Sequence, residues 1–97
     1  MARHYVDELR VSAAAVEELA AHGVIEDEVL EVSWNDPAFF RDKVRGRELM
    51  IGKSDGGRLL TVVVQPSGTL GAWDVVTGWD ADGGERTEWQ KARGRQR

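Results

Sequence analysis

The segment from Gly52 to Val64, Gly-Lys-Ser-Asp-Gly-Gly-Arg-Leu-Leu-Thr-Val-Val-Val, constrains the fold of this chain more than any other. It predicts a strand, a tight turn and a second strand, because residues 54–57 tolerate the positive φ angles of a short hairpin. Residues 59–64 are almost wholly apolar and rich in β-branched side chains, so we expect a central strand covered on both faces. Arg58 is the charged residue at the start of that strand.

The length and composition favour one folded domain. The chain has 97 residues and a hydrophobic fraction of 41%, enough for one modest core. We expect a single domain over residues 1–97, with a core from about residue 5 to 92 and a basic tail at 93–97. The absence of cysteine excludes disulfides and thiolate chemistry. No apolar run approaches a membrane span of about 20 residues and no signal-peptide pattern is present, so a cytoplasmic location is expected.

Charge is distributed unevenly along the chain. Residues 1–40 carry nine acids and two bases, a net charge of −7, whereas residues 41–97 carry eleven bases and eight acids, a net charge of +3. A basic second half is typical either of a solvated helix end or of a patch that binds a polyanion. The overall charge of −4 weakens polyanion binding without excluding it, because the local field matters more than the sum.

Local patterns predict one strand and two helices in the first third of the chain. Residues 5–11 alternate apolar and polar side chains, as a short edge strand does. Ser12 is a favourable N-cap for a helix over residues 13–21, which Gly23 ends. Acids in the first turn and an apolar stripe predict a second helix over residues 26–32, which Asn35-Asp-Pro37 breaks.

The rest of the chain predicts a charged connection, three strands and a helix. Residues 41–47 form the connection, either as an exposed loop or as a basic loop beside a binding cleft. The strands are expected at residues 48–53, 58–65 and 70–79. Asp82 and Glu85 fit a capping box for a last helix over residues 83–92. The order β-α-α-β-β-β-α predicts an α+β two-layer sandwich, in which an antiparallel meander packs against helices.

Common catalytic and metal-binding motifs are not found in the sequence. Gly52-Lys-Ser54 resembles the end of a phosphate-binding loop, but Arg47 stands where that motif requires glycine, and a strand follows instead of a helix. His4 and His22 lack a second ligand at metal spacing, so we expect no metal and no cofactor. No serine lies in a nucleophile-elbow pattern.

Four tryptophans are unusual in so short a chain. Trp73 and Trp79 are six residues apart on one predicted strand, which places them on the same face of the sheet. They either fill the core or form a platform on which bases or partner side chains stack. We expect Trp89 to dock the last helix on the sheet and Trp34 to do the same for the second helix.

Two roles are open for Arg58. It either pairs with a neighbouring acid (Asp55, Asp74 or Glu85) or grips a phosphate with two hydrogen bonds. RNA cleavage by transesterification needs no metal, but it needs a base for the 2′-hydroxyl, a cation for the phosphorane charge and an acid for the leaving oxygen. Arg58 is a candidate for the cation alone.

Several short motifs follow one another between about residues 5 and 92. They are His22-Gly-Val24, Asn35-Asp-Pro37, Leu49-Met-Ile-Gly-Lys-Ser54, Gly57-Arg-Leu-Leu-Thr-Val-Val63, Asp74-Val-Val-Thr77, Ala81, and Glu85-Arg86 with Trp89. In this order they resemble the BrnT family, the toxins of bacterial type II toxin–antitoxin pairs. The resemblance implies a RelE-like fold and a metal-independent ribonuclease that arrests translation. It also implies a ribbon-helix-helix antitoxin that neutralises the toxin and forms a DNA-binding, oligomeric complex with it.

The resemblance also indicates which residues would act. Arg58 matches the family's arginine at the start of the central strand, and Arg86 matches the arginine of the last helix. Gly78 and Trp79 stand where the family has an arginine or arginine pair. Losing such cations lowers the rate of phosphoryl chemistry by orders of magnitude.

Two hypotheses follow for the function. In the first, Arg58 and Arg86 hold the scissile phosphate as catalytic residues, while Lys53, Trp79 and Arg47 bind RNA. In the second, the chain keeps the toxin fold without catalysis and binds a protein partner through its apolar and tryptophan surface.

Overall fold

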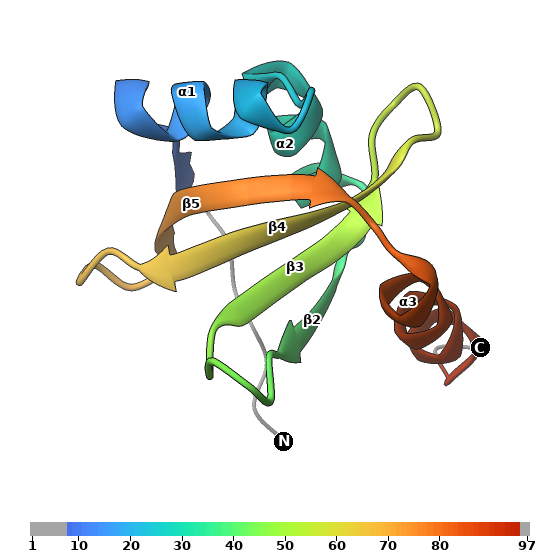
Figure 1. The fold of residues 1–97 in the computed structure, drawn as a ribbon. Helices are drawn as coiled ribbons and strands as arrows, with labels where there is room; N and C mark the ends of the chain where they lie inside the picture. The colour runs from blue at the N-terminus through green and yellow to red at the C-terminus, as the bar shows by residue number, and fades with distance from the viewer. Residues whose placement is uncertain (1–7, 96–97) are drawn as a thin grey trace.

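The computed structural model describes residues 8–95, which form a small α+β domain with three helices and a five-stranded mixed sheet (Figure 1). In chain order the elements are β1 (Glu8–Arg10), α1 (Ala13–Ala21), α2 (Glu26–Trp34), β2 (Ala38–Arg41), β3 (Glu48–Lys53), β4 (Leu59–Pro66), β5 (Ala72–Asp80) and α3 (Gly83–Arg95). The sheet order is β1-β5-β4-β3-β2. The parts of the predicted edge strand and basic tail at residues 5–7 and 96–97 lie outside the described residues, as does His4.

Strand β4 lies at the centre of the sheet, as the sequence predicts. It pairs antiparallel with β3 on one side and with β5 on the other. Leu60, Val62 and Val64 belong to an apolar cluster that includes residues of α1 and α2, whereas Leu59 and Val63 belong to a second cluster. Because alternate residues of a strand point to opposite faces, β4 is buried on both sides.

Helices α1 and α2 cover one face of the sheet, and α1 begins with the predicted N-cap. The Ser12 hydroxyl accepts a hydrogen bond from the backbone N–H of Ala15 at 3.1 Å. At the start of α2, the Glu28 carboxylate accepts one from the N–H of Ile25 at 3.1 Å. Leu19 of α1 is completely buried against the sheet. Helix α2 ends at Trp34, two residues later than predicted.

Helix α3 lies on the opposite face, so the predicted two-layer arrangement is wrong: helices cover both faces of the sheet. Helix α3 contacts β2 and β3, and Trp89 packs against the cluster that contains Leu49 and Ile51. Met50, the residue between them, belongs to the cluster under α1 and α2. The alternation along β3 therefore places α3 across the sheet from the other helices (Figure 1).

The capping box at the start of α3 is confirmed. The N–H of Glu85 donates to the Asp82 carboxylate at 2.8 Å, and the N–H of Asp82 donates to the Glu85 carboxylate at 2.9 Å. The helix continues to Arg95, so the first part of the predicted basic tail is helical.

The sequence analysis missed strand β2 and therefore gave the wrong element order. Phe39 pairs with Met50 and Phe40 with Leu49, which makes β2 the edge of the sheet next to β3. The charged connection is a shorter β2–β3 hairpin, residues 42–47, whose N–H groups at Val44 and Arg45 donate to Asp42. A four-residue strand placed between a proline turn and a charged run shows too little alternation to be recognised.

The sheet is mixed rather than a purely antiparallel meander, and its last strand is irregular. Strand β1 pairs parallel to β5. Val64 pairs with Val75 but Val63 pairs with Thr77, so Val76 is an extra residue in β5. Such a bulge reverses the alternation of the side chains that follow it. Trp73 and Trp79 accordingly lie in different clusters, and the prediction that they share one face is wrong.

Candidate functional site

Arg58 lies immediately before β4 and is held by two carboxylates. Its Nε donates to Asp80 Oδ1 at 2.7 Å and its Nη2 donates to Asp80 Oδ2 at 3.0 Å. Its Nη1 donates to Glu28 Oε1 at 3.0 Å and to the backbone oxygen of Gly23 at 2.8 Å. All three guanidinium nitrogens are therefore engaged, and the side chain is only 30% exposed. The acids differ from Asp55, Asp74 and Glu85, the partners named from the sequence.

The hydrogen bonds of the Arg58 side chain join four parts of the fold that are distant in the sequence. Arg58 immediately precedes β4, Asp80 ends β5, Glu28 lies in the first turn of α2, and Gly23 follows α1. The hydrogen bonds from Arg58 lower the pKa of Asp80, and those two bonds are also the main reason that the pKa of Arg58 is raised. The geometry is that of a structural cross-link between the helical layer and the sheet.

The structure gives Arg86 surroundings different from those of Arg58. Arg86 is exposed on α3. Within residues 8–95 no hydrogen bond or ion pair of its side chain is found, whereas Arg58 is bound to two carboxylates. A phosphate held by Arg86 would not be held by the nitrogens of Arg58, because those nitrogens already face Asp80 and Glu28.

Trp79 lies on the α3 face of the sheet, beside the cation predicted to bind RNA with it. The Arg47 guanidinium lies 5.8 Å from the centre of the Trp79 ring, and the His22 ring meets it edge-on at 6.2 Å. Trp79 Nε1 donates to Glu85 Oε1 at 3.1 Å. Arg47 also pairs with Asp42 at 3.1 Å, so its charge is compensated.

Gly78, the other departure from the family pattern, is fixed by packing. A Cβ atom at this position would lie 3.0 Å from Leu19 Cδ2 and 3.1 Å from the backbone oxygen of Thr61. Any side chain here would push α1 away from β5 or distort the sheet. An arginine therefore does not fit at residue 78 in this packing.

Lys53 belongs to a different part of the surface. Its Nζ lies 5.4 Å from the centre of the Trp89 ring, and the Arg93 guanidinium lies 5.2 Å from the same centre. These side chains line an open cavity of about 510 Å³ together with Asn35, Ser54, Asp55 and Gly57. Arg93 also lies 3.9 Å from the Asp36 carboxylate. The structure thus separates Lys53 from the Arg47–Trp79 pair.

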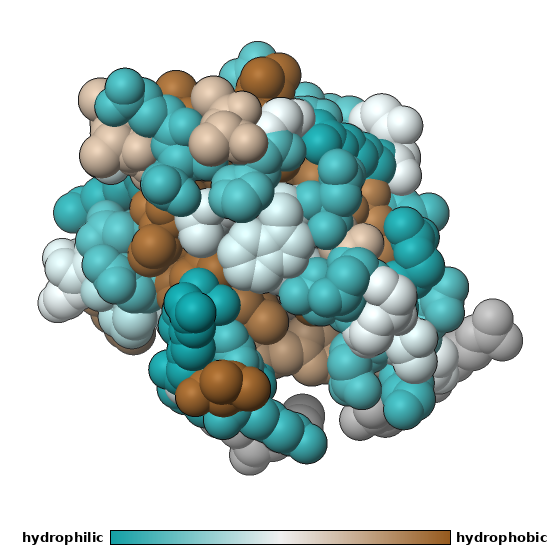
Figure 2. Space-filling view, in the orientation of Figure 1, coloured by the Kyte–Doolittle hydropathy of each residue, from teal (hydrophilic) through white to brown (hydrophobic). Residues whose placement is uncertain are grey.

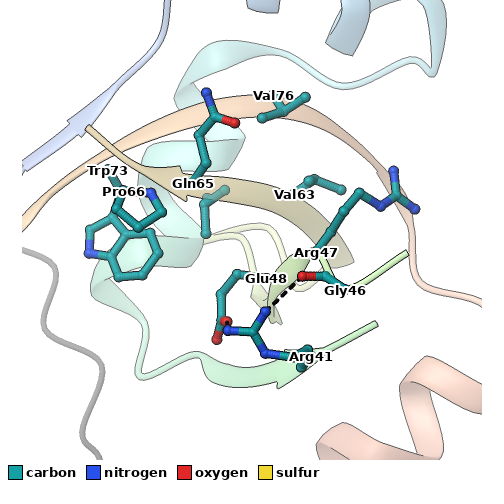
Figure 3. A pocket seen from close by; sticks show the side chains of 10 residues that line it. Arg41, Gly46, Arg47, Glu48, Val63, Gln65, Pro66, Trp73 and Val76 are labelled. Atoms are coloured by element: carbon teal, nitrogen blue, oxygen red, sulfur yellow. Dashed lines mark hydrogen bonds and ion pairs between the residues drawn. The ribbon is translucent and has the colours of Figure 1, made fainter. Parts of the chain in front are cut away.

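A cavity of about 390 Å³ lies between the β2–β3 hairpin, the last residues of β4 and the first half of β5 (Figure 3). Trp73 lines one end and Arg47 the other. Arg41 donates to the backbone oxygen of Gly46 at 2.7 Å and pairs with the buried Glu48 at 3.3 Å. Both arginines of this cavity are therefore paired with carboxylates.

A groove of about 460 Å³ separates the β2–β3 hairpin from the start of α3. We call it the hairpin–α3 groove. Its floor is apolar and is made by Phe40, Leu49 and Ile51. One side carries the cations Arg41 and Lys43, and the other side carries Gly84 with the acids Asp82, Glu85 and Glu88. In Figure 2 apolar surface is visible on this face of the molecule, between hydrophilic side chains.

The expectation that Trp34 docks the second helix on the sheet is wrong. The Trp34 side chain is 64% exposed, and its Nε1 lies 3.5 Å from Asp55 Oδ1.

Residues 8–95 contain no group of three or more histidine or acidic side chains arranged to hold a metal ion. Among the helices described, none has the length and apolar character that crossing a bilayer requires.

Comparisons with known proteins add no assignment. A scan against protein-family models and a search of curated proteins found no match to this chain.

The residues that the sequence analysis missed are the partners of Arg58. Glu28 was recognisable only as an acid in the first turn of a helix, and Asp80 as an acid at the end of a strand. Their meeting depends on how α2 crosses the sheet, and no local pattern encodes that.

Proposed function

We propose that this chain is a non-catalytic relative of BrnT-like toxins, a small α+β module that binds a protein partner and does not cleave RNA. The observation that carries this proposal is the pairing of Arg58 with Asp80 and Glu28. The partner implied by the sequence resemblance is a ribbon-helix-helix antitoxin in the bacterial cytoplasm.

The pairing of Arg58 argues against a catalytic role on electrostatic grounds. A cation that stabilises a phosphorane must direct unused N–H groups at the developing charge. Arg58 directs its nitrogens at two carboxylates and one backbone carbonyl. A phosphate would have to displace these acceptors, and Asp80 and Glu28 would repel it at close range.

The other arginine positions that the resemblance implies do not compensate for the loss of Arg58. Gly78 has no room for a side chain, and Trp79 donates its N–H to Glu85 instead of offering a charge. Of the arginines that the resemblance implies for catalysis, Arg86 remains as one exposed cation, on a helix whose first turns also carry Glu85 and Glu88. A single such cation does not supply the base, the acid and the charge stabilisation that metal-free RNA cleavage requires.

The proposal is tested with the purified chain and single-stranded RNA in the presence of a metal chelator. We expect no cleavage above that of an Arg58→Met/Arg86→Met double variant, and no loss of growth or of cellular RNA on inducible expression. The matched control is an Asp80→Asn/Glu28→Gln variant, in which Arg58 loses both negative partners. Cleavage by the unmodified chain that disappears in the double variant, with the fold retained, would overturn the proposal.

A further inference from the structure

The hairpin–α3 groove combines an apolar floor with walls of opposite charge. Leu49 and Ile51 are buried in the second cluster, and Phe40 is half-buried beside them. The cavity volume of about 460 Å³ is in the range of sites that take up small ligands or a few side chains. The apolar surface that an occupant meets on this floor is mainly that of Phe40, with a small part of Leu49.

In the described residues, no lysine or arginine neutralises the Glu85 carboxylate on the acidic wall. The Glu85 carboxylate accepts hydrogen bonds from the Thr61 hydroxyl at 2.9 Å, from Trp79 Nε1 at 3.1 Å and from the N–H of Asp82. These are neutral donors, and within the described part of the chain no lysine or arginine pairs with Glu85. Glu88 lies 3.9 Å from Lys91, a long contact between exposed side chains. The wall carries uncompensated negative charge.

The opposite wall is positive, and one of its two cations makes no ion pair within the described residues. Arg41 is bound to the Gly46 carbonyl and to Glu48. Lys43 is exposed, and in residues 8–95 it makes no ion pair. A ligand that crosses the groove thus meets a negative surface on one side and a positive charge on the other.

We propose that the hairpin–α3 groove binds an amphipathic peptide segment of a partner protein. The segment inserts apolar side chains over Phe40, Leu49 and Ile51. It places a lysine or arginine against the acidic wall and an aspartate or glutamate near Lys43. This inference rests on the proposed function, because it names the surface through which the module binds its partner.

Charge complementarity favours a peptide over RNA as the occupant. Three carboxylates line the groove, so a polyanion would meet repulsion along one whole wall. A peptide can match both walls, since it carries charges of either sign on one short segment.

The experiment selects short random peptides displayed on phage against the immobilised full chain. A parallel selection uses a Lys43→Glu/Glu88→Lys variant, in which each wall carries one charge of the opposite sign. We expect apolar peptides with both a basic and an acidic residue from the first selection. The best peptide, labelled with a fluorophore, should bind the charge-exchanged variant about tenfold more weakly in an anisotropy titration.

A matched pair of glycine variants localises the binding to the groove. Gly84 lines the groove, and a Cβ there would meet only Asp82 Oδ1 at an ordinary 3.5 Å, so Gly84→Tyr should fold and obstruct the groove. Gly94 lies on the same helix with nothing within 4 Å of a Cβ. We expect Gly84→Tyr to weaken peptide binding about tenfold and Gly94→Tyr to leave it unchanged.

Three outcomes of the binding experiments would overturn the inference. They are the absence of enriched peptides, equal binding by the Gly84→Tyr variant, and competition by a single-stranded RNA oligonucleotide. Self-association of the chain that Gly84→Tyr abolishes, measured by sedimentation, would assign the groove to a second copy instead. RNA cleavage by the chain would overturn the proposed function without affecting the peptide result. If no peptide is enriched and the chain does not cleave RNA, the inference about the groove is overturned but the proposed function is not.

Discussion

Arg58, the residue before β4, and Asp80, the last residue of β5, are joined by two hydrogen bonds of 2.7 and 3.0 Å. The same guanidinium reaches Glu28 and the Gly23 carbonyl in the helical layer. Arg58, which the sequence resemblance assigns to catalysis, therefore links the helical layer to the sheet in this chain.

Replacing Arg58 should destabilise the fold. Arg58→Met removes the cation between two carboxylates, and we expect the free energy of unfolding to fall by about 1–3 kcal/mol, since the pair is partly exposed and screened by solvent. Urea unfolding followed by circular dichroism measures the change. The control is Arg86→Met, which removes an exposed arginine without a partner in the described chain and should leave the midpoint unchanged. Equal midpoints for the two variants would contradict the structural role.

Acidification should weaken the same cross-link. The pKa of Asp80 is lowered by hydrogen bonds from Arg58, so its carboxylate contributes stability at neutral pH. That contribution is present above the unfolded-state pKa of about 4 and is lost as the pH falls through the lower folded-state value. Urea midpoints measured from neutral pH down to acid should therefore fall less steeply for Asp80→Asn than for the unmodified chain. Parallel curves would show that Asp80 does not contribute.

Asp42 should add to the acid sensitivity through a different mechanism. Its pKa is lowered first by the backbone N–H of Val44 and then by Arg47, both within the β2–β3 hairpin. Protonation of Asp42 should loosen that hairpin before the sheet unfolds. Hydrogen exchange at low pH should then show faster exchange at Val44 and Arg45 than in β4, whereas Asp42→Asn should show that fast exchange already at neutral pH.

Gly78 should not tolerate even a methyl group. A Cβ there would lie 3.0 Å from Leu19 Cδ2, so Gly78→Ala should lower the free energy of unfolding by about 1–3 kcal/mol. Gly94→Ala, in the open last part of α3, is the matched control, and helix propensity predicts no loss and a gain of up to about 1 kcal/mol. Thermal unfolding of both variants tests the contrast, which would fail if Gly78→Ala were neutral.

Glu85 should act as a structural acceptor. It caps α3 and accepts from Thr61 and Trp79 on neighbouring strands, so Glu85→Ala leaves these donors without their partner. We expect a loss of about 1–3 kcal/mol and a red shift of tryptophan fluorescence. Glu88→Ala, on the same helix, should change neither. A loss of stability as large in Glu88→Ala would indicate a general effect of charge on α3.

The sequence predicts those parts of the fold that local chemistry determines. The apolar, β-branched residues 59–64 indicate a central strand because such a run has to be buried on both faces. Ser12 and the pair Asp82–Glu85 identify helix starts because their side chains bond to nearby backbone.

Features that depend on distant pairing could not be predicted in the same way. Phe39 and Phe40 form a strand only because β3 offers a free edge. The extra residue Val76 moves Trp79 to the other face from Trp73, which spacing alone cannot show. The candidate site was least predictable, since the partners of Arg58 come from α2 and the end of β5.

The parallel pairing of β1 with β5 has a consequence for synthesis on the ribosome. Glu8 pairs with Ala72, so strand β1 has no neighbour in the sheet until β5 has been translated. Closing so long a loop is slow compared with forming the β3–β4 hairpin, which joins adjacent segments. The emerging chain should therefore carry a formed hairpin while its N-terminal strand and α1 wait for β5, and the last step of folding should be their docking.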